Sequence, residues 1–142
     1  MIYYFIPEDN ALKRQEYGTY VWRDNSHPLP ISYLTSYAAM GLSKLSKTNT
    51  TQIANFDFIM ETRVAKQPKA FVLSHFLDSG AFTIRTKAAE YAKENKCGEY
   101  DYYDLPEFWS YCDEYAEFVK ANRIAIDLFA NVDAIPGPAI DV

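Results

Sequence analysis

The sequence predicts an α/β protein built from parallel βα units, and three features of its second half carry that prediction. Residues 70–77 (AFVLSHFL) form an apolar run bounded by a proline and by Asp-Ser-Gly, which is typical of a strand buried on both faces of a sheet. Residues 105–119 place apolar side chains three and four positions apart, as an amphipathic helix does. Residues 124–130 (IAIDLFA) form a second apolar strand. Strand, helix and strand in this order predict a βαβ unit with parallel strands.

The first half gives weaker signals. An apolar stretch at 1–6 is typical of a short strand, whereas residues 8–30 are polar and rich in turn formers. Residues 31–39 (ISYLTSYAA) predict a strand that runs into the start of a helix. A polar loop is expected over 43–52, and residues 53–65 show only weak helical spacing.

Two helices are expected between the strands of the second half. Residues 86–96 favour a helix that ends at Gly98. The sequence Asp104-Leu105-Pro106-Glu107 predicts a helix start, with a capping side chain, a proline in the first turn and an acid three residues after the cap. The acidic, aromatic stretch between the helices, residues 99–104 (EYDYYD), is expected to be an exposed loop.

Length and composition limit the number of domains and the class of protein. A chain of 142 residues with 49% hydrophobic residues predicts one globular domain over 1–142. No apolar run approaches the roughly 20 residues that cross a bilayer, and MIYYFIP lacks the features of a signal peptide. The prediction is therefore a cytoplasmic protein without membrane contact.

Charge is distributed unevenly. The net charge is −5 overall, made up of −1 over residues 1–40, +4 over 41–96 and −8 over 97–142. The net negative charge excludes a general polyanion-coating protein. The basic middle, which includes Lys66, Lys69, Arg85 and Lys87, allows contact with phosphate, although solvated surface lysines are the commoner explanation.

The chain has few cysteine and histidine side chains that could bind a metal or take part in redox chemistry. The chain has two cysteines, Cys97 and Cys112, and two histidines, His27 and His75. These do not make the usual structural zinc set, so we expect no metal, no cofactor and free, partly buried thiols. His75 lies within an apolar run, where a hydrogen-bonded core histidine is commoner than a catalytic one.

Two carboxylates mark the expected site. Asp78 follows the first predicted strand of the second half and Asp133 follows the second. Parallel strands end at the same edge of a sheet, where ligands of α/β proteins bind. In the loop after the first strand, Ser79 offers a hydroxyl, Gly80 allows close backbone approach and Phe82 offers a ring for stacking. Ordinary turn chemistry at Asp-Ser-Gly is the competing interpretation.

The segments FLDSGAF (76–82) and DLFANVDAIPGP (127–138) resemble those of the tRNA-guanine transglycosylase (queuine tRNA-ribosyltransferase) family, and the likeness is greatest to its compact phage members. That resemblance implies a TIM-barrel-like fold and the exchange of guanine for a 7-deazaguanine base in nucleic acid. It implies that Asp78 is the catalytic acid or base, acting with Ser79, and that Asp133 grips the base. Gly80 and Phe82 match the rest of the first segment.

The resemblance covers about residues 70–138, and the chain departs from the family pattern within and beyond it. Ala81 stands where many members have a second glycine. The nucleophilic aspartate and the zinc site of the family lie further along than this sequence reaches. A full (β/α)8 barrel needs about 250 residues, so 142 residues predict a partial barrel, the front of a longer protein or a chain completed by another.

The predicted function is therefore nucleobase exchange, with a purine or 7-deazaguanine base bound between Asp78 and Asp133 and with tRNA or DNA as the polymer. For a phage protein the compartment would be the host cytoplasm. One alternative is a base- or nucleotide-binding module without catalysis, and a second is an interaction protein with no purine site. An exposed sheet edge would also favour a homo-oligomer or a completing partner chain.

Overall fold

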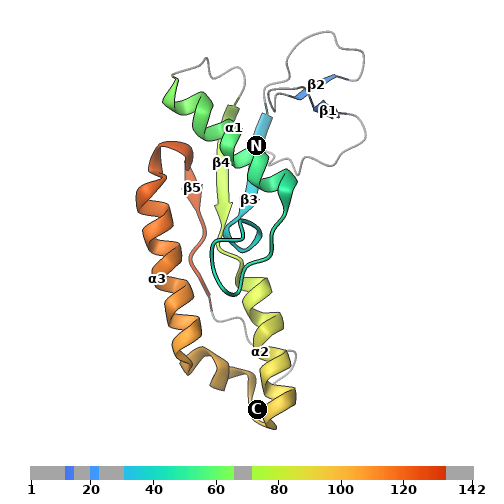
Figure 1. Cartoon of the computed structure of the whole chain (residues 1–142), viewed down its shortest axis with the longest axis vertical. Coiled ribbons are helices and arrows are strands. Elements are labelled where there is room, and N and C mark those ends of the chain that lie inside the picture. Colours follow the sequence, from blue (N-terminus) through green and yellow to red (C-terminus); the bar gives the residue numbers. More distant parts are fainter. Residues whose placement is uncertain (1–11, 15–19, 23–30, 66–71, 134–142) are drawn as a thin grey trace.

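The computed structural model describes residues 12–14, 20–22, 31–65 and 72–133 (Figure 1). The predicted strand at 1–6 lies outside these residues. The strands are β1 (Leu12–Arg14), β2 (Tyr20–Trp22), β3 (Ile31–Ser36), β4 (Val72–Asp78) and β5 (Leu128–Phe129). The α-helices are α1 (Thr50–Val64), α2 (Ala81–Asn95) and α3 (Pro106–Ala121), and short 3-10 helices cover η1 (Tyr37–Ala39), η2 (Glu99–Asp104) and η3 (Arg123–Ala125).

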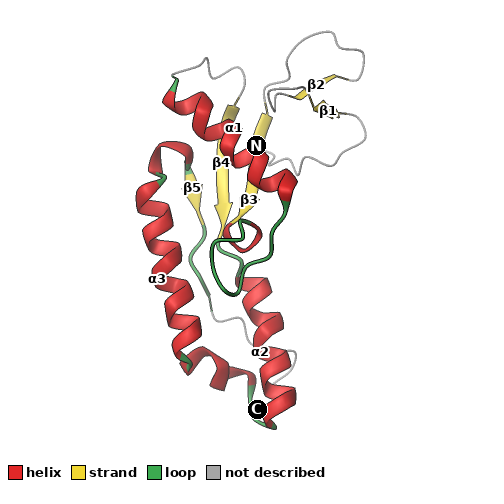
Figure 2. Ribbon diagram, viewed as in Figure 1, coloured by secondary structure: helices red, strands yellow, loops and turns green. Residues whose placement is uncertain are grey.

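The central element is a parallel sheet in the order β3-β4-β5 (Figure 2). β1 and β2 form a separate antiparallel pair. α1 connects β3 to β4, and α2, η2 and α3 connect β4 to β5. The predicted α/β class and the parallel βαβ unit are therefore confirmed.

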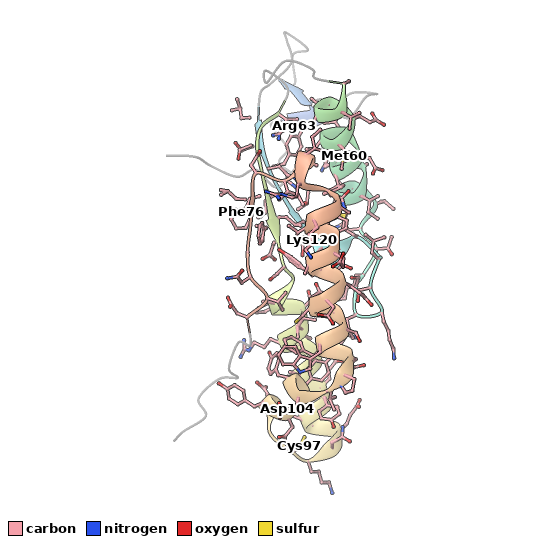
Figure 3. All side chains as sticks on the ribbon, turned by 90° about the vertical axis from the view of Figure 1, so that its left-hand side faces the viewer. Met60, Arg63, Phe76, Cys97, Asp104 and Lys120 are labelled. Atoms are coloured by element: carbon pink, nitrogen blue, oxygen red, sulfur yellow. The ribbon has the colours of Figure 1, made fainter. Side chains whose placement is uncertain are left out.

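One face of this sheet is covered by helices. α1 and α3 lie on the same side of the sheet, whereas the Phe76 side chain points to the other side (Figure 3). The register pairs Leu34 with Phe76 and Phe76 with Leu128, so these three side chains form a row across the face opposite α1 and α3. Leu73 is 56% exposed and Leu128 is 50% exposed. Residues 70 and 71 lie outside the described residues. Within 72–77 the predicted burial on both faces fails at Leu73 and is only partial at Ser74 and Phe76.

Aromatic packing joins the two helices to the covered face. Phe56 of α1 lies 5.3 Å from Phe118 of α3 and 5.6 Å from His75 of β4, measured between ring centroids. Tyr37 packs against Phe118 as well, at 5.0 Å. Burial of such rings supplies most of the favourable free energy that fixes a small two-layer domain.

Helix boundaries differ from the sequence predictions for local reasons. α1 begins at Thr50, within the expected loop, because the Asn49 side chain accepts a hydrogen bond from the Gln52 N–H (3.1 Å) and so caps the helix. α2 begins at Ala81, five residues before the predicted start, because Gly80 adopts a left-handed φ of +83° as its N-cap. The C-cap residue of α2 is Lys96, with φ of +52°, rather than Gly98.

The segment before α3 corrects two further predictions. Residues 99–104 are not an exposed loop, because Tyr102 and Tyr103 are 2% and 6% exposed and belong to the core. Asp104 does not cap α3; its N-cap is Leu105, with Pro106 in the first turn as predicted. Trp109, which lies in the predicted amphipathic helix, is 57% exposed and so is not part of its buried face.

β5 is shorter than the predicted strand over 124–130. The η3 turn replaces the first part of that strand, and its last residue, Ala125, points its carbonyl oxygen at the His75 ring (2.6 Å). A main-chain hydrogen bond from the Ala130 N–H to the Leu77 oxygen (3.0 Å) continues the contact beyond β5. The hydrogen bond between Ala125 and the His75 side chain of β4 thus holds the chain out of the sheet before β5 begins.

Candidate functional site

The ends of β4 and β5 are held together by hydrogen bonds. Besides the bond from Ala130 to Leu77, the Ser79 hydroxyl donates to the main-chain oxygen of Asn131 (2.9 Å). The segment that carries Asp133 therefore leaves the sheet beside the segment that carries Asp78. This is the shared carboxyl edge that the parallel topology predicts.

Asp78 is the last residue of β4 and pairs in register with Ser36 of β3. Because side chains alternate along a strand, Asp78 is on the same face as Phe76, the face that α1 and α3 leave uncovered. It is half-buried. Its carboxylate is thus placed at the strand ends, near enough to Tyr111 and Tyr115 of α3 to interact with both phenols.

Ser79 and Gly80 are enclosed rather than open to a ligand. Ser79 is 1% exposed. A Cβ atom at Gly80 would lie 2.4 Å from the Ala38 Cβ and 2.6 Å from the Tyr111 hydroxyl oxygen. Only glycine fits this close approach in a left-handed conformation. In this geometry both residues position the loop after β4.

The other two predicted site residues are accessible. Phe82, in the first turn of α2, is 68% exposed. Asp133 is exposed and is the last described residue of the segment after β5. An exposed ring and an exposed carboxylate are free to meet a ligand from solvent, and their contact with one remains a prediction.

Two tyrosines of α3, neither of them predicted as a site residue, fix both strand ends. The Tyr111 hydroxyl donates to the Ser79 carbonyl oxygen (2.5 Å), and the Tyr115 hydroxyl donates to the Ala130 carbonyl oxygen (2.6 Å). Burial raises the pKa of both phenols, and the nearby Asp78 carboxylate raises it further, so both stay protonated donors. The signal in the sequence was a pair of tyrosines four residues apart on the helix.

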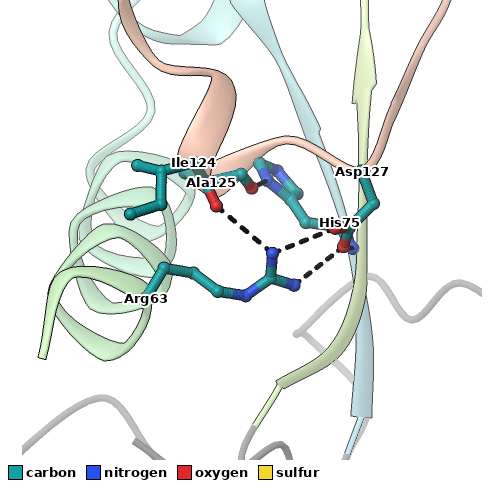
Figure 4. A network of polar contacts seen from close by, with 5 residues as sticks. All are labelled: Arg63, His75, Ile124, Ala125 and Asp127. Carbon is teal, nitrogen blue, oxygen red and sulfur yellow. Dashed lines mark hydrogen bonds and ion pairs between the residues drawn. The ribbon is translucent and has the colours of Figure 1, made fainter. Parts of the chain in front are cut away.

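His75 is a hydrogen-bonded core histidine, as predicted (Figure 4). It is fully buried; its Nδ1 lies 2.6 Å from the Ala125 oxygen and its Nε2 lies 2.7 Å from the Thr35 hydroxyl. A carbonyl oxygen only accepts, so Nδ1 carries the proton and Nε2 accepts from Thr35. Burial lowers the His75 pKa and keeps the ring neutral. This ring is therefore a structural bridge between strands.

An ion pair next to His75 was not predicted from the sequence. Arg63 of α1 binds Asp127 through both guanidinium nitrogens (2.9 and 2.8 Å), and Asp127 also accepts from the His75 N–H (2.7 Å). The hydrogen bond from Arg63 is the main cause that lowers the Asp127 pKa. Asp127 precedes β5, at the amino end of that strand, so this pair stabilises the end of the sheet away from Asp78.

A groove of ≈ 470 Å³ lies between α3 and the segment Phe129–Val132. Neither Asp78 nor Asp133 is among its lining residues. The groove therefore contains neither carboxylate, although its lining residue Val132 is next to Asp133.

Within the described part of the chain, no group of three or more His, Cys, Asp or Glu side chains is arranged to hold a metal ion. Cys97 and Cys112 are free, half-buried thiols, as predicted. Of the basic residues considered for phosphate contact, Arg85 and Lys87 lie on α2, whereas Lys66 and Lys69 lie outside the described residues. A search of the described helices finds none that is long and apolar enough to span a membrane.

Comparison of the chain with protein-family models, curated proteins and solved structures gives no match.

Proposed function

We propose that this chain binds a guanine-type base at the carboxyl edge of its sheet and belongs to the machinery of base exchange in tRNA or DNA. The observation that carries the proposal is the hydrogen-bonded union of the ends of β4 and β5. Ser79 bonds to Asn131, and Ala130 bonds to Leu77, which puts the Asp78 and Asp133 segments side by side.

The residue chemistry suits a guanine ring. Guanine presents two donors, N1–H and the exocyclic amine, and a carboxylate accepts from both. In the proposal Asp133 supplies this carboxylate, and the exposed Phe82 ring stacks on the base. Asp78, at the end of β4, exchanges a proton with the base. Ser79 and Gly80 hold the loop.

Catalysis needs one further group. Exchange breaks the bond between the ribose carbon and the outgoing base and forms the same bond to the incoming one, and the proposed fold is part of a TIM-like barrel whose remaining strands supply the attacking carboxylate. A base in a duplex or stacked loop must also be flipped out to reach Asp78.

A binding module without catalysis is the second candidate, and one observation favours it. The third strand that ends at this edge, β3, ends in Ser36 rather than in a carboxylate. Besides Asp78 and Asp133, both of which the proposal assigns to the base, the ends of the described strands β3, β4 and β5 therefore offer no further acid to attack ribose. Such a module would sequester a base or serve a catalytic partner.

Calorimetric titration with guanine and with a 7-deazaguanine tests the proposal. We expect the wild-type protein to bind, and Asp78→Asn and Asp133→Asn each to weaken binding about tenfold to a hundredfold. Asp57→Asn, an exposed carboxylate on α1, is the matched control and should bind as the wild type does. A folded wild-type protein that binds neither base contradicts the proposal and supports the interaction protein.

Exchange is tested separately from binding. Incorporation of labelled guanine into tRNA or DNA in the presence of the chain, lost in Asp78→Asn, would support the enzyme. Binding without incorporation would support the module.

A further inference from the structure

We propose that the groove between α3 and β5 is a docking site for helix α2 of a second copy of this chain. This inference does not rest on base binding, although Asp133 belongs both to the proposed base site and to the rim of the groove. Its first support is the apolar character of the groove, which is lined on one side by α3 and on the other by Phe129–Val132. Two large rings in its lining, Trp109 and Phe129, are 57% and 53% exposed. Exposed aromatic surface grouped in a hollow is typical of a protein contact.

The position of the groove also favours a helix as its occupant. α1 and α3 form a layer over one face of the sheet (Figure 3). α3 is joined to the segment after β5 by the hydrogen bond from the Tyr115 hydroxyl to the carbonyl oxygen of Ala130. A helix seated between α3 and Phe129 would extend this layer by one element.

The rim of the groove is acidic. Asp113 lies one turn after Trp109 on the same stripe of α3, and Asp133 follows the lining residue Val132 on the opposite side; both are exposed. Lys120 in the lining is paired with Glu117 at 3.5 Å. Asp113 and Asp133 therefore favour a partner with positive charge at their part of the rim, away from Lys120.

Helix α2 offers the complementary surface. Ile84 and Ala88 are its buried residues. The stripe on the opposite side of the helix starts at Thr86, one turn after Phe82. Thr86, Ala89 and Lys93 follow one another at spacings of three and four on this stripe, and all three are exposed. The small side chains leave room for the Trp109 and Phe129 rings, while Lys93 reaches the acidic rim. The acids Glu90 and Glu94 lie to one side of the stripe.

The contact joins two different surfaces, so each copy keeps one free groove and one free helix. Such head-to-tail interfaces build rings or filaments rather than closed pairs. Self-association should therefore grow with protein concentration beyond a dimer and weaken as salt is added.

Sedimentation velocity over a concentration series tests the proposal through charge reversal. Lys93→Glu and Asp113→Lys should each weaken self-association about tenfold or more, because like charges then meet across the interface. The double variant that carries both changes, and an equimolar mixture of the two single variants, should recover it. Circular dichroism confirms that these exposed positions leave the fold unchanged.

Matched controls reverse the same charges off the contact surface. Lys87→Glu lies on the same helix as Lys93 but away from the stripe, and Glu114→Lys lies on α3 on the side away from the groove; both should associate as the wild type does. A wild-type protein that stays monomeric at all concentrations overturns the proposal. Equal effects of the control and stripe variants, or no recovery in the double variant, overturn it as well.

Discussion

The Tyr111 hydroxyl donates a hydrogen bond to the main-chain oxygen of Ser79, 2.5 Å away, and so ties the middle of α3 to the loop after β4. This loop carries Asp78 at its start and Gly80 at its end. The contact couples helix packing to the geometry of the proposed base site, because the carbonyl that it fixes is adjacent to Asp78.

Tyr111→Phe removes this hydrogen bond and leaves the Ser79 oxygen buried without that donor. We expect the free energy of unfolding to fall by about 1–3 kcal/mol, with base affinity falling in parallel. Urea denaturation measures the first effect and calorimetry the second. Tyr100→Phe, on a 49% exposed side chain of η2, is the control, and a loss of stability there equal to that of Tyr111→Phe would contradict the account.

Gly80→Ala should destabilise the protein strongly. The new Cβ would lie 2.4 Å from the Ala38 Cβ, in a backbone with φ of +83°. Left-handed strain and overpacking each cost about 1–3 kcal/mol. At Gly98 the nearest atom to an added Cβ, Asp101 Oδ2, is 4.0 Å away and φ is −82°. Gly98→Ala should therefore leave the melting temperature nearly unchanged, and equal losses at both sites would contradict this geometry.

His75 should make the protein acid-sensitive below pH 6.5. Burial lowers its pKa from the ordinary value of 6.5, so the unfolded chain binds the proton more readily than the folded chain. The free energy of unfolding then falls as pH drops from 6.5 toward the lower folded pKa. Asp127 contributes little in this range, because its pKa is lowered from 3.8 and its stabilisation is lost only at more acidic pH.

Denaturation at pH 7.5 and pH 5.5 measures this effect. His75→Gln should be less stable at both values but lose less stability between them, since glutamine does not titrate. Equal losses in the wild type and in His75→Gln would assign the acid sensitivity to other groups.

Arg63→Lys should lower stability by about 1 kcal/mol. Lysine keeps the charge but cannot span both Asp127 oxygens or reach the Ile124 carbonyl as the guanidinium does. The side chains of Arg63 and Asp127 are 24% and 36% exposed, so solvent weakens the attraction between them. Lys120→Gln breaks the much more exposed pair with Glu117 and should cause no measurable change. A larger loss at Lys120 than at Arg63 would contradict this ranking.

The sequence predicted β4, α3 and the parallel arrangement because their apolar periodicity is local and strong. It also placed Asp78 and Asp133 at strand ends, which follows from the βαβ order. The short β5 was not predictable, because Ala125 turns out of the sheet to meet His75, fifty residues earlier. No spacing rule anticipates such a contact.

Long-range polar partners were missed for the same reason. Arg63 and Asp127 are 64 residues apart and meet only once α1 is packed on the sheet. Tyr111 was not predicted as a site residue, although it is fully buried. A tyrosine packs its ring and still requires a partner for its hydroxyl, and that partner, the Ser79 carbonyl, is set by the tertiary fold.

The most direct test of base binding at the edge of the sheet is a nuclear magnetic resonance titration of the isotopically labelled chain with guanine. The account predicts that amide shifts concentrate at Asp78–Phe82 and Asn131–Asp133 and are absent from the His75–Arg63 end of the sheet. No shifts at saturating guanine, or shifts confined to the α3 residues that line the groove, such as Trp109, Ala116 and Lys120, would contradict it.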